Sequence, residues 1–295
     1  MSFTLPSFAK INLDLRVIGK RDDGYHELFT VFQTVSLCDE ISFVASNALE
    51  MTCSDPLIPI DNHNLIIQAA NILRQRFGVS SGVKIHLEKR IPAPGGLGGG
   101  SSNAAVALIG LKRLWDLELN SEEMVEIAAT LGSDVPFFLY GGTAMGFGRG
   151  TVVEPIKDVI EDFLLIVTPN VYISTGDAFK KLNAASLTTE DAERILLNCR
   201  FNDKTIDLRH TALKNDFEPI VFAGHPQITL VKETLLDLGA VNVLLSGSGA
   251  SVFAVFDKEE TRQTAMKALD LHVNWRTFAA ATISREEYRD KLKLR

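Results

Sequence analysis

The sequence has few cysteines, no long apolar run and no excess of positive charge. Among its 295 residues are only three cysteines, Cys38, Cys53 and Cys199, which lie far apart and form no CxxC pair. Neither a disulfide framework nor a structural zinc site is therefore supported, and the cysteines are expected to be reduced, mostly buried thiols. The histidines outside the motifs described below, namely His63, His86, His210, His225 and His272, show no metal-ligand spacing either. No metal ligand is predicted.

The charge pattern excludes two classes of partner. Lys and Arg total 30 against 37 Asp and Glu, which gives a net charge of −7, and the basic residues form no runs. Nucleic acid and membrane surfaces both need a positive footprint, so neither is predicted as a partner. No window approaches the roughly 18 apolar residues that cross a bilayer. Because residues 1–17 also lack the pattern of a signal peptide, a cytoplasmic protein is expected. The oligomeric state stays open, a homodimer included.

The apolar fraction of 46% is typical of a chain with substantial buried cores. Alternating apolar residues predict strands at 4–17, 41–45 and 83–87 in the first half. A helix is predicted at 65–77, with Asp61 or Asn62 as its cap and Gly78 as its end. Strands and helices that alternate in this way indicate an α+β architecture. We expect two domains, 1–155 and 156–295.

Other elements follow from caps and periodicity. Asn120 and Glu123 have the spacing of a capping box for a helix that runs to about Leu131. In the second half, the pattern predicts helices at 189–198, 211–221 and 226–238, and strands at 163–167, 241–245 and 251–256.

The most informative segment is the glycine-rich stretch from Pro92 to Ala105. Five of the six positions from Gly95 to Gly100 are glycine, and a helical pattern follows at once, from Ser101 to about Trp115. A helix that begins after such a loop is an anion site, because its first N–H groups are unpaired and glycine lets a phosphate approach the backbone. Ser101 and Ser102 add hydroxyls that are expected at the N-cap. The alternative is a tight connector with no ligand.

Two known nucleotide motifs do not fit this loop. It contains no GxxxxGK[ST], and Ser101 occupies the place of the last glycine in GxGxxG. Two further segments favour a functional interpretation. Residues 132–138 read GSDVPFF, with a carboxylate in a turn before an apolar stretch, and residues 244–251 read LLSGSGAS, a second small-residue loop between strands. Three such loops in one chain are hard to explain as connectors.

These segments, in this order, resemble the GHMP kinase superfamily, whose central motif reads approximately PxxxGLGSSAA. The N-terminal segments AKINLDL at 9–15 and RDDGYHEL at 21–28 make the resemblance more specific. Together they resemble the members that act on a cytidine-diphosphate-linked methylerythritol. The resemblance covers residues 9 to about 256. It implies an N-terminal domain like the second domain of ribosomal protein S5, a ferredoxin-like C-terminal domain, and transfer of the γ-phosphoryl group of ATP with Mg²⁺ to a small-molecule hydroxyl.

The resemblance also implies roles for two charged residues. Asp134, in GSDVPFF, matches the catalytic Asp of the family, and Lys10, in AKINL, matches a Lys that lies beside that Asp. A neighbouring cation favours the carboxylate form that a general base needs. Without the resemblance, Asp134 could merely cap a turn, and a lone Lys on an alternating strand would be solvated.

Substrate and nucleotide contacts are implied in the same way. Tyr25 is expected to stack on the cytosine and His26 to hydrogen-bond to its edge, while Asn12, Thr175 and Phe179 are further substrate contacts. The alternative for Phe179 is an ordinary core position on a helix. Nucleotide contacts are expected from Asn64, Lys89, Pro94, Gly95, Gly96, Leu97, Gly98, Gly99, Gly100, Ser101 and Ser102. Pro94 departs from the family pattern, since proline offers no N–H to a phosphate and stiffens the loop.

Two other hypotheses stay open at this point. The first is a GHMP kinase that acts on mevalonate or homoserine, although neither of those substrates carries a base for Tyr25 to stack on. The second is a sensor that binds nucleotide without turnover, although a sensor has no need of Asp134 and Lys10.

Overall fold

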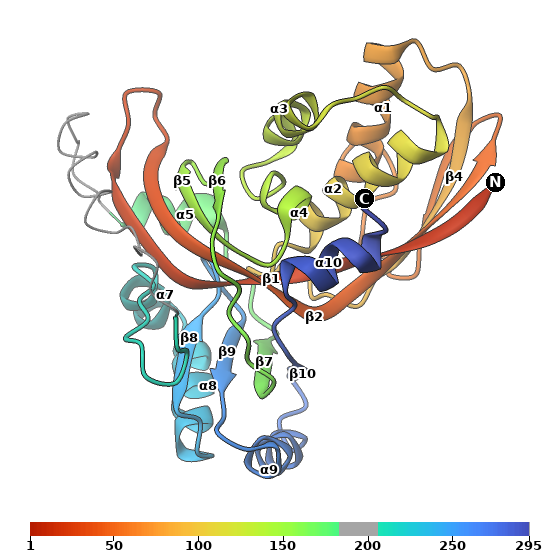
Figure 1. Cartoon of the computed structure of the whole chain (residues 1–295). Helices are drawn as coiled ribbons and strands as arrows, with labels where there is room; N and C mark the ends of the chain where they lie inside the picture. Colours follow the sequence, from red (N-terminus) through yellow and green to blue (C-terminus); the bar gives the residue numbers. More distant parts are fainter. Residues whose placement is uncertain (183–205, 295) are drawn as a thin grey trace.

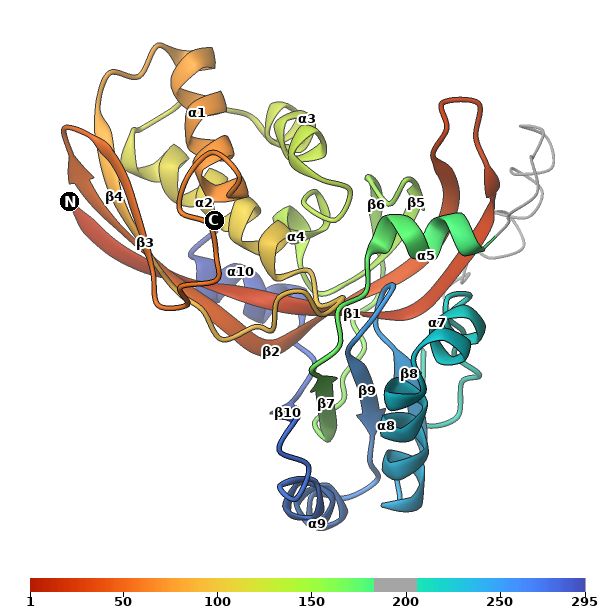
Figure 2. The same ribbon diagram turned by 180° about the vertical axis from the view of Figure 1, so that it is seen from behind.

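The computed structural model describes residues 1–182 and 206–294, which form an α+β fold with four layers. Figure 1 shows a group of helices above a long twisted sheet and a second sheet with its own helices below it. Figure 2 gives the same arrangement from behind. Three clusters of buried side chains separate these layers, one between each neighbouring pair. The expected α+β class is confirmed.

The first sheet is organised around two long strands. It contains β1 (Ser2–Lys20), β2 (His26–Ser46), β3 (Leu49–Cys53), β4 (Gly82–Glu88), β5 (Thr143–Gly148) and β6 (Val152–Pro155). The sheet order is β3-β4-β2-β5-β6, and β1 pairs antiparallel along the remaining edge of β2. Strands β4 and β5 each pair with only part of β2. The β1–β2 hairpin is thus much longer than its neighbours and extends across the whole molecule (Figure 1).

Helices cover one face of this sheet. They are α1 (Leu65–Phe77), α2 (Gly99–Leu114), α3 (Ser121–Leu131), α4 (Phe137–Tyr140) and, from the far end of the chain, α10 (Arg285–Leu292). The capping box of Asn120 and Glu123 and the end of α1 at Gly78 are confirmed. The predicted cap of α1 is wrong, because Asn64 accepts the hydrogen bond from the N–H of Ile66.

The second sheet is antiparallel throughout, in the order β10-β7-β9-β8. Its strands are β7 (Leu164–Pro169), β8 (Asn242–Leu245), β9 (Val252–Val255) and β10 (Trp275–Ala280). The helices α5 (Thr175–Lys181), α7 (Glu218–Gly224), α8 (Pro226–Asp237) and α9 (Glu259–Leu269) belong to this half. Leu164 and Ile166 face the first sheet while Leu165 and Val167 face the helices, as the alternation of a strand requires.

Some predictions in the second half differ from the structure. The strands expected at 163–167, 241–245 and 251–256 and the helix at 226–238 are confirmed within a residue or two. The helix expected at 211–221 is wrong, because α7 begins only at Glu218. Pro219 lies in its first turn, where proline is tolerated, and no helix could continue through it from residue 211. The helix expected at 189–198 lies outside the described residues.

The chain passes from the first sheet to the second between Pro155 and Leu164. The predicted domain ranges of 1–155 and 156–295 stay predictions. The last helix, however, packs back on the first half, because Tyr288 and Leu292 of α10 are buried in the core between the first sheet and its helices.

A β-bulge decides which residues of β1 face the space beside the first sheet. Asn12 pairs with Phe32 and Asp14 with Val31, so that Leu13 is an extra residue. A single extra residue reverses the alternation of side chains. Lys10 and Asn12 therefore point to the same side as Leu15, and together with alternate residues of β2 they line one cavity.

Candidate active site

The glycine loop, strand β1 and the loop at 246–251 meet at one place. The N–H of Lys10 donates to the carbonyl of Leu97 at 3.0 Å, and the N–H of Ser251 donates to the carbonyl of Gly95 at 3.1 Å. The hydroxyl of Ser246 donates to the carbonyl of Gly96, also at 3.0 Å. Two of the three small-residue segments, the glycine loop and the loop at 246–251, therefore pack directly on each other.

Gly96 shows how tightly these two loops fit. It has φ of +73°, and a Cβ at this position would overlap the carbonyl oxygen of Ser246. Gly96 and Gly98 both line the cavity, while a Cβ on Gly100 would meet nothing within 4 Å. The first N–H groups of α2 begin directly after Gly98, which is its N-cap and offers no side chain to them. This end of the cavity is therefore a ready anion site.

The serines after the loop lie differently from their expected positions. Gly98 is the N-cap of α2, so the expectation that Ser101 and Ser102 stand at the cap is wrong. The hydroxyl of Ser102 is fully buried and accepts a hydrogen bond from Ser7 at 2.8 Å. The side chain of Leu97 is buried in the core between the sheets. Nucleotide contacts from Leu97, Ser101 and Ser102, as from Pro94, Gly95 and Gly99, stay predictions.

Lys10 and Asp134 lie side by side at the floor of the cavity. Their Nζ and Oδ2 atoms are 3.4 Å apart, and the side chain of Lys10 is only 4% exposed against 32% for Asp134. The ammonium group also donates to Oδ1 of Asn12 at 2.6 Å, and the amide of Asn12 donates to the hydroxyl of Thr30 at 2.7 Å. The lysine is thus held by two partners, and the carboxylate keeps a face open to the cavity.

The turn that carries Asp134 is held from below. Phe137 and Phe138 of α4 follow directly and are both fully buried. The hydroxyl of Tyr288 donates to the carbonyl of Phe138, and the ring of Tyr288 occupies the space where Gly141 has no side chain. The C-terminal helix therefore fixes the segment that presents the carboxylate.

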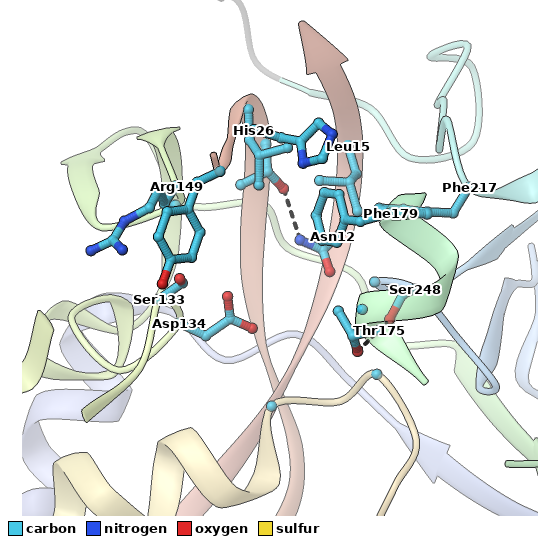
Figure 3. A pocket seen from close by; sticks show the side chains of 18 of the residues that line it. Asn12, Leu15, His26, Ser133, Asp134, Arg149, Thr175, Phe179, Phe217 and Ser248 are labelled. Atoms are coloured by element: carbon cyan, nitrogen blue, oxygen red, sulfur yellow. Dashed lines mark hydrogen bonds between the residues drawn. The ribbon is translucent and has the colours of Figure 1, made fainter. Parts of the chain in front are cut away.

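The cavity has a volume of about 760 Å³ and runs from the glycine loop to the tip of the β1–β2 hairpin (Figure 3). Its walls include nine residues that the sequence predicted: Lys10, Asn12, Tyr25, His26, Gly96, Gly98, Asp134, Thr175 and Phe179. Leu28, Thr30 and Phe32 come from alternate positions of β2, and Gly247 and Ser248 come from the second small-residue loop. One cavity thus joins the anion site, the Lys10–Asp134 pair and a group of aromatic rings.

The aromatic end of the cavity already contains a stacked pair. The rings of His26 and Phe179 lie 4.9 Å apart with an interplanar angle of 24°, and Phe217 meets Phe179 edge-on at 4.8 Å. Figure 3 shows the rings of His26 and Phe179 next to each other in the pocket. His26 therefore covers one face of the Phe179 ring. Burial, and to a smaller degree the charge of Lys20, hold the pKa of His26 below its ordinary value.

Thr175 and Tyr25 both line the cavity. The hydroxyl of Thr175 is 2.9 Å from that of Ser248, so the start of α5 contacts the second small-residue loop. Tyr25 is 54% exposed at the tip of the hairpin, and the guanidinium carbon of Arg149 lies 4.4 Å from the centre of its ring.

Two predicted nucleotide residues, Lys89 and Asn64, are not among the cavity walls. Lys89 forms a buried ion pair with Asp39 at 2.9 Å and also donates to the carbonyl of Ile91. Burial lowers the pKa of Lys89, while Asp39 opposes that effect. A Cβ on Gly99 would lie 3.3 Å from its Nζ, so the ammonium group lies against the start of α2.

Asn64 is engaged as well. Its side-chain oxygen caps α1, and its amide group donates to the carbonyl of Pro59 at 2.7 Å. Nucleotide contacts from Asn64 and Lys89 stay predictions.

Several residues of this site were not predicted from the sequence. Arg149, Lys20, Lys180, Ser133 and Ser248 all line the cavity. Arg149 had a local signal, since it stands between Gly148 and Gly150 in the turn that joins β5 to β6. Asp39 had no such local signal, because the sequence around a single Asp within a long strand does not indicate which residue it pairs with.

The comparisons with known proteins agree with this geometry. Residues 64–142 match the GHMP kinases N terminal domain, and residues 200–273 match the family described as GHMP kinases C terminal. A crystal structure of a homoserine kinase from Cytophaga hutchinsonii superposes with a TM-score of 0.66 over 95% of each chain at 20% identity, which shows a shared fold. The expected two-domain GHMP fold is confirmed.

More similar relatives share one name. The 4-diphosphocytidyl-2-C-methyl-D-erythritol kinase of Solibacter usitatus is 39% identical over 97% of this chain and 90% of its own length. That of Chlorobium phaeobacteroides is 40% identical over 90% of both. A crystal structure of 4-(cytidine 5'-diphospho)-2C-methyl-D-erythritol kinase superposes with a TM-score of 0.74 at 30% identity, over 95% of this chain and 99% of the other. The chain therefore belongs to the 4-diphosphocytidyl-2-C-methyl-D-erythritol kinase family of the GHMP kinases.

Proposed function

We propose that this chain transfers the γ-phosphoryl group of ATP to the 2-hydroxyl of 4-diphosphocytidyl-2-C-methyl-D-erythritol, with Asp134 as general base. The product is the 2-phosphate, a precursor in the non-mevalonate route to isoprenoids. The observation that carries the proposal is that Lys10 and Asp134 lie in the same cavity as the glycine loop and the aromatic group. A kinase needs these three parts within reach of one substrate.

Asp134 takes the proton of the attacking hydroxyl. Its carboxylate faces the cavity and lies 3.4 Å from the ammonium group of Lys10. As the acceptor oxygen attacks the γ-phosphorus, its bond to phosphorus forms, the bond to the β-phosphate oxygen breaks, and ADP leaves. Phosphoryl transfer depends mainly on positioning and electrostatics. Lys10, held by Asn12, supplies a fixed positive charge beside the developing charge.

The glycine loop binds the phosphates of ATP. Gly96 and Gly98 line the cavity, and the free N–H groups at the start of α2 favour an anion there. In residues 1–182 and 206–294, no group of three or more His, Cys, Asp or Glu side chains could hold a metal. A Mg²⁺ ion that arrives with ATP would be held mainly by the phosphates and would neutralise part of their charge.

The hairpin tip and α5 bind the cytidine end of the acceptor. Tyr25 offers an exposed ring, and His26 offers a largely neutral imidazole, since its pKa is lowered. Asn12 and Thr175 lie nearer the reacting end and offer polar groups to the methylerythritol unit. In the described part of the chain, no helix is both long and apolar enough to cross a membrane. Because the reaction consumes ATP, the proposal includes the cytoplasm, which supplies ATP, as the place of reaction.

The test is ADP formation by the purified protein with Mg-ATP and the cytidine-linked acceptor, with mevalonate and homoserine as control acceptors. Replacement of Asp134→Asn keeps the size of the side chain but removes the base. We expect kcat to fall about 10²- to 10⁴-fold, the usual contribution of a general base. Lack of turnover with the cytidine-linked acceptor, or an Asp134→Asn variant as fast as wild type, would overturn the proposal.

A further inference from the structure

We propose that Arg149 holds the ring of Tyr25 in the position that receives the base, and so sets the affinity for the cytidine-containing acceptor. This inference rests on the proposed function. The guanidinium carbon of Arg149 lies 4.4 Å from the centre of the Tyr25 ring, and both residues line the cavity. Figure 3 shows Arg149 on the wall opposite His26 and Phe179.

The main chain of Tyr25 is fixed, but its ring needs another support. The carbonyl of Tyr25 accepts from the N–H of Arg21 at 2.8 Å, and its own N–H donates to Oδ1 of Asp23 at 3.1 Å. The ring itself is more than half exposed at the tip of the hairpin. An exposed tyrosine samples several rotamers and loses that freedom on binding a base. A planar cation that stacks on one face of the ring restricts its rotamers before the base binds, so that less conformational entropy is lost on binding.

The turn that carries Arg149 is itself held in register with the hairpin. The N–H of Gly148 donates to Oε1 of Glu27 at 3.0 Å, and Glu27 also forms an ion pair with Arg21. Gly148 and Gly150 both have positive φ, which allows the tight turn between β5 and β6. The backbone that carries Arg149 is therefore tied to the hairpin turn that carries Tyr25.

The guanidinium group is available for stacking. Among the salt bridges of residues 1–182 and 206–294, none involves Arg149, whereas Lys180, another cation on the cavity wall, pairs with Asp177 at 3.6 Å. A planar guanidinium stacks on a ring in a way that an ammonium group does not. The competing role for Arg149 is a direct contact with the diphosphate of the acceptor, which the experiment separates from the role in positioning.

The experiment is a double-mutant cycle with Arg149→Gln, Tyr25→Leu and the double variant. We expect Arg149→Gln to raise the KM for the cytidine-linked acceptor about two- to fivefold, the size of an exposed cation–π contact. The kcat and the KM for ATP should not change, because neither residue touches the reacting atoms. Arg149→Lys should behave like Arg149→Gln. In the Tyr25→Leu background, Arg149→Gln should have no further effect.

Lys180→Gln is the matched control, since it removes a cation from the same cavity without touching Tyr25. Its effect should be equal in the wild-type and Tyr25→Leu backgrounds. An equal loss from Arg149→Gln in both backgrounds, weaker at high salt, would assign Arg149 to the diphosphate and overturn the inference, as would no effect in either. Since wild-type turnover is measured in the same series, its absence would instead overturn the proposed function.

Discussion

The two ends of the cavity are built from different parts of the chain. The phosphate end consists of main chain, with Gly96 and Gly98 pressed against Lys10 and the loop at 246–251. The cytidine end consists of side chains, with Tyr25 and His26 on a partly exposed hairpin tip. In the proposed function, the first end binds the phosphates of ATP, which the GHMP kinases share, while the second binds the part that distinguishes one acceptor from another.

This difference predicts that substitutions at the two ends of the cavity change different properties of the protein. A substitution replaces a side chain and leaves the main-chain N–H in place. The positions of these N–H groups therefore depend on the packing that holds the loop. Exposed side chains can be replaced with little effect on the fold, because few buried contacts depend on them. Changes at the phosphate end should therefore affect stability as well as ATP binding, whereas changes at the cytidine end should affect acceptor binding alone.

The largest effect is expected at the buried ion pair beneath the phosphate end. Lys89→Met removes the cation and leaves the fully buried carboxylate of Asp39 without its charge partner. Removal of one partner of a buried pair costs about 3–5 kcal/mol. We expect the free energy of unfolding to fall by that amount and the KM for ATP to rise, measured by denaturant titration and by kinetics.

The matched control is Lys84→Met, which breaks an ion pair with Glu50 that is more than half exposed on both sides. Such a pair contributes less than about 1 kcal/mol. If both variants lost the same stability, the buried pair would not support the loop.

A smaller effect is expected within the loop itself. Gly96→Ala places a Cβ against the carbonyl of Ser246 at a residue with positive φ. Overpacking of this kind costs about 1–3 kcal/mol. The midpoint of thermal unfolding should fall and the KM for ATP should rise.

Gly100→Ala introduces the same methyl group into open space within α2. Alanine is favoured over glycine in a helix by about 1 kcal/mol, so the midpoint should not fall. A lower midpoint for Gly100→Ala than for Gly96→Ala would contradict the packing argument.

The phosphate end had the clearer local signal in the sequence, yet of the expected nucleotide residues only Gly96 and Gly98 line the cavity, whereas all the expected substrate residues do. The loop from Gly95 to Gly100 carried its own signal, because a run of glycines directly before a helix is typical of an anion site, although a tight connector was the alternative. Lys10 and Asp134 were paired only through the family resemblance, since they are 124 residues apart in the sequence. Arg149 and Asp39 were missed, because their partners are set by strand pairing that local patterns do not show.

The fold shows the same limit. The alternation in β1 and the caps of α1 and α3 were visible as local patterns, although the cap of α1 was assigned to the wrong residue. Strand β5 was missed because its glycines resemble a loop. Gly146 is glycine because the ring of Phe32 on the neighbouring strand occupies the space of its Cβ. That reason lies in packing, which a single sequence does not reveal.

The smallest effect concerns the protonation of His26 at the cytidine end. Its folded pKa lies below the ordinary value of 6.5, mainly because of burial, so the imidazole stays neutral as the pH falls through 6.5. We expect the KM for the cytidine-linked acceptor to stay constant from pH 8 to about 6.5 and to rise only at lower pH, once the ring gains a charge next to Lys20. The same sign holds for stability: the unfolded chain binds the proton first, so the contribution of neutral His26 is full above 6.5 and declines as the pH falls toward the folded pKa. His26→Asn, which does not titrate, should give a KM that lacks this rise. A rise that begins above pH 6.5 in wild type, or that persists in His26→Asn, would show that another group controls acceptor binding.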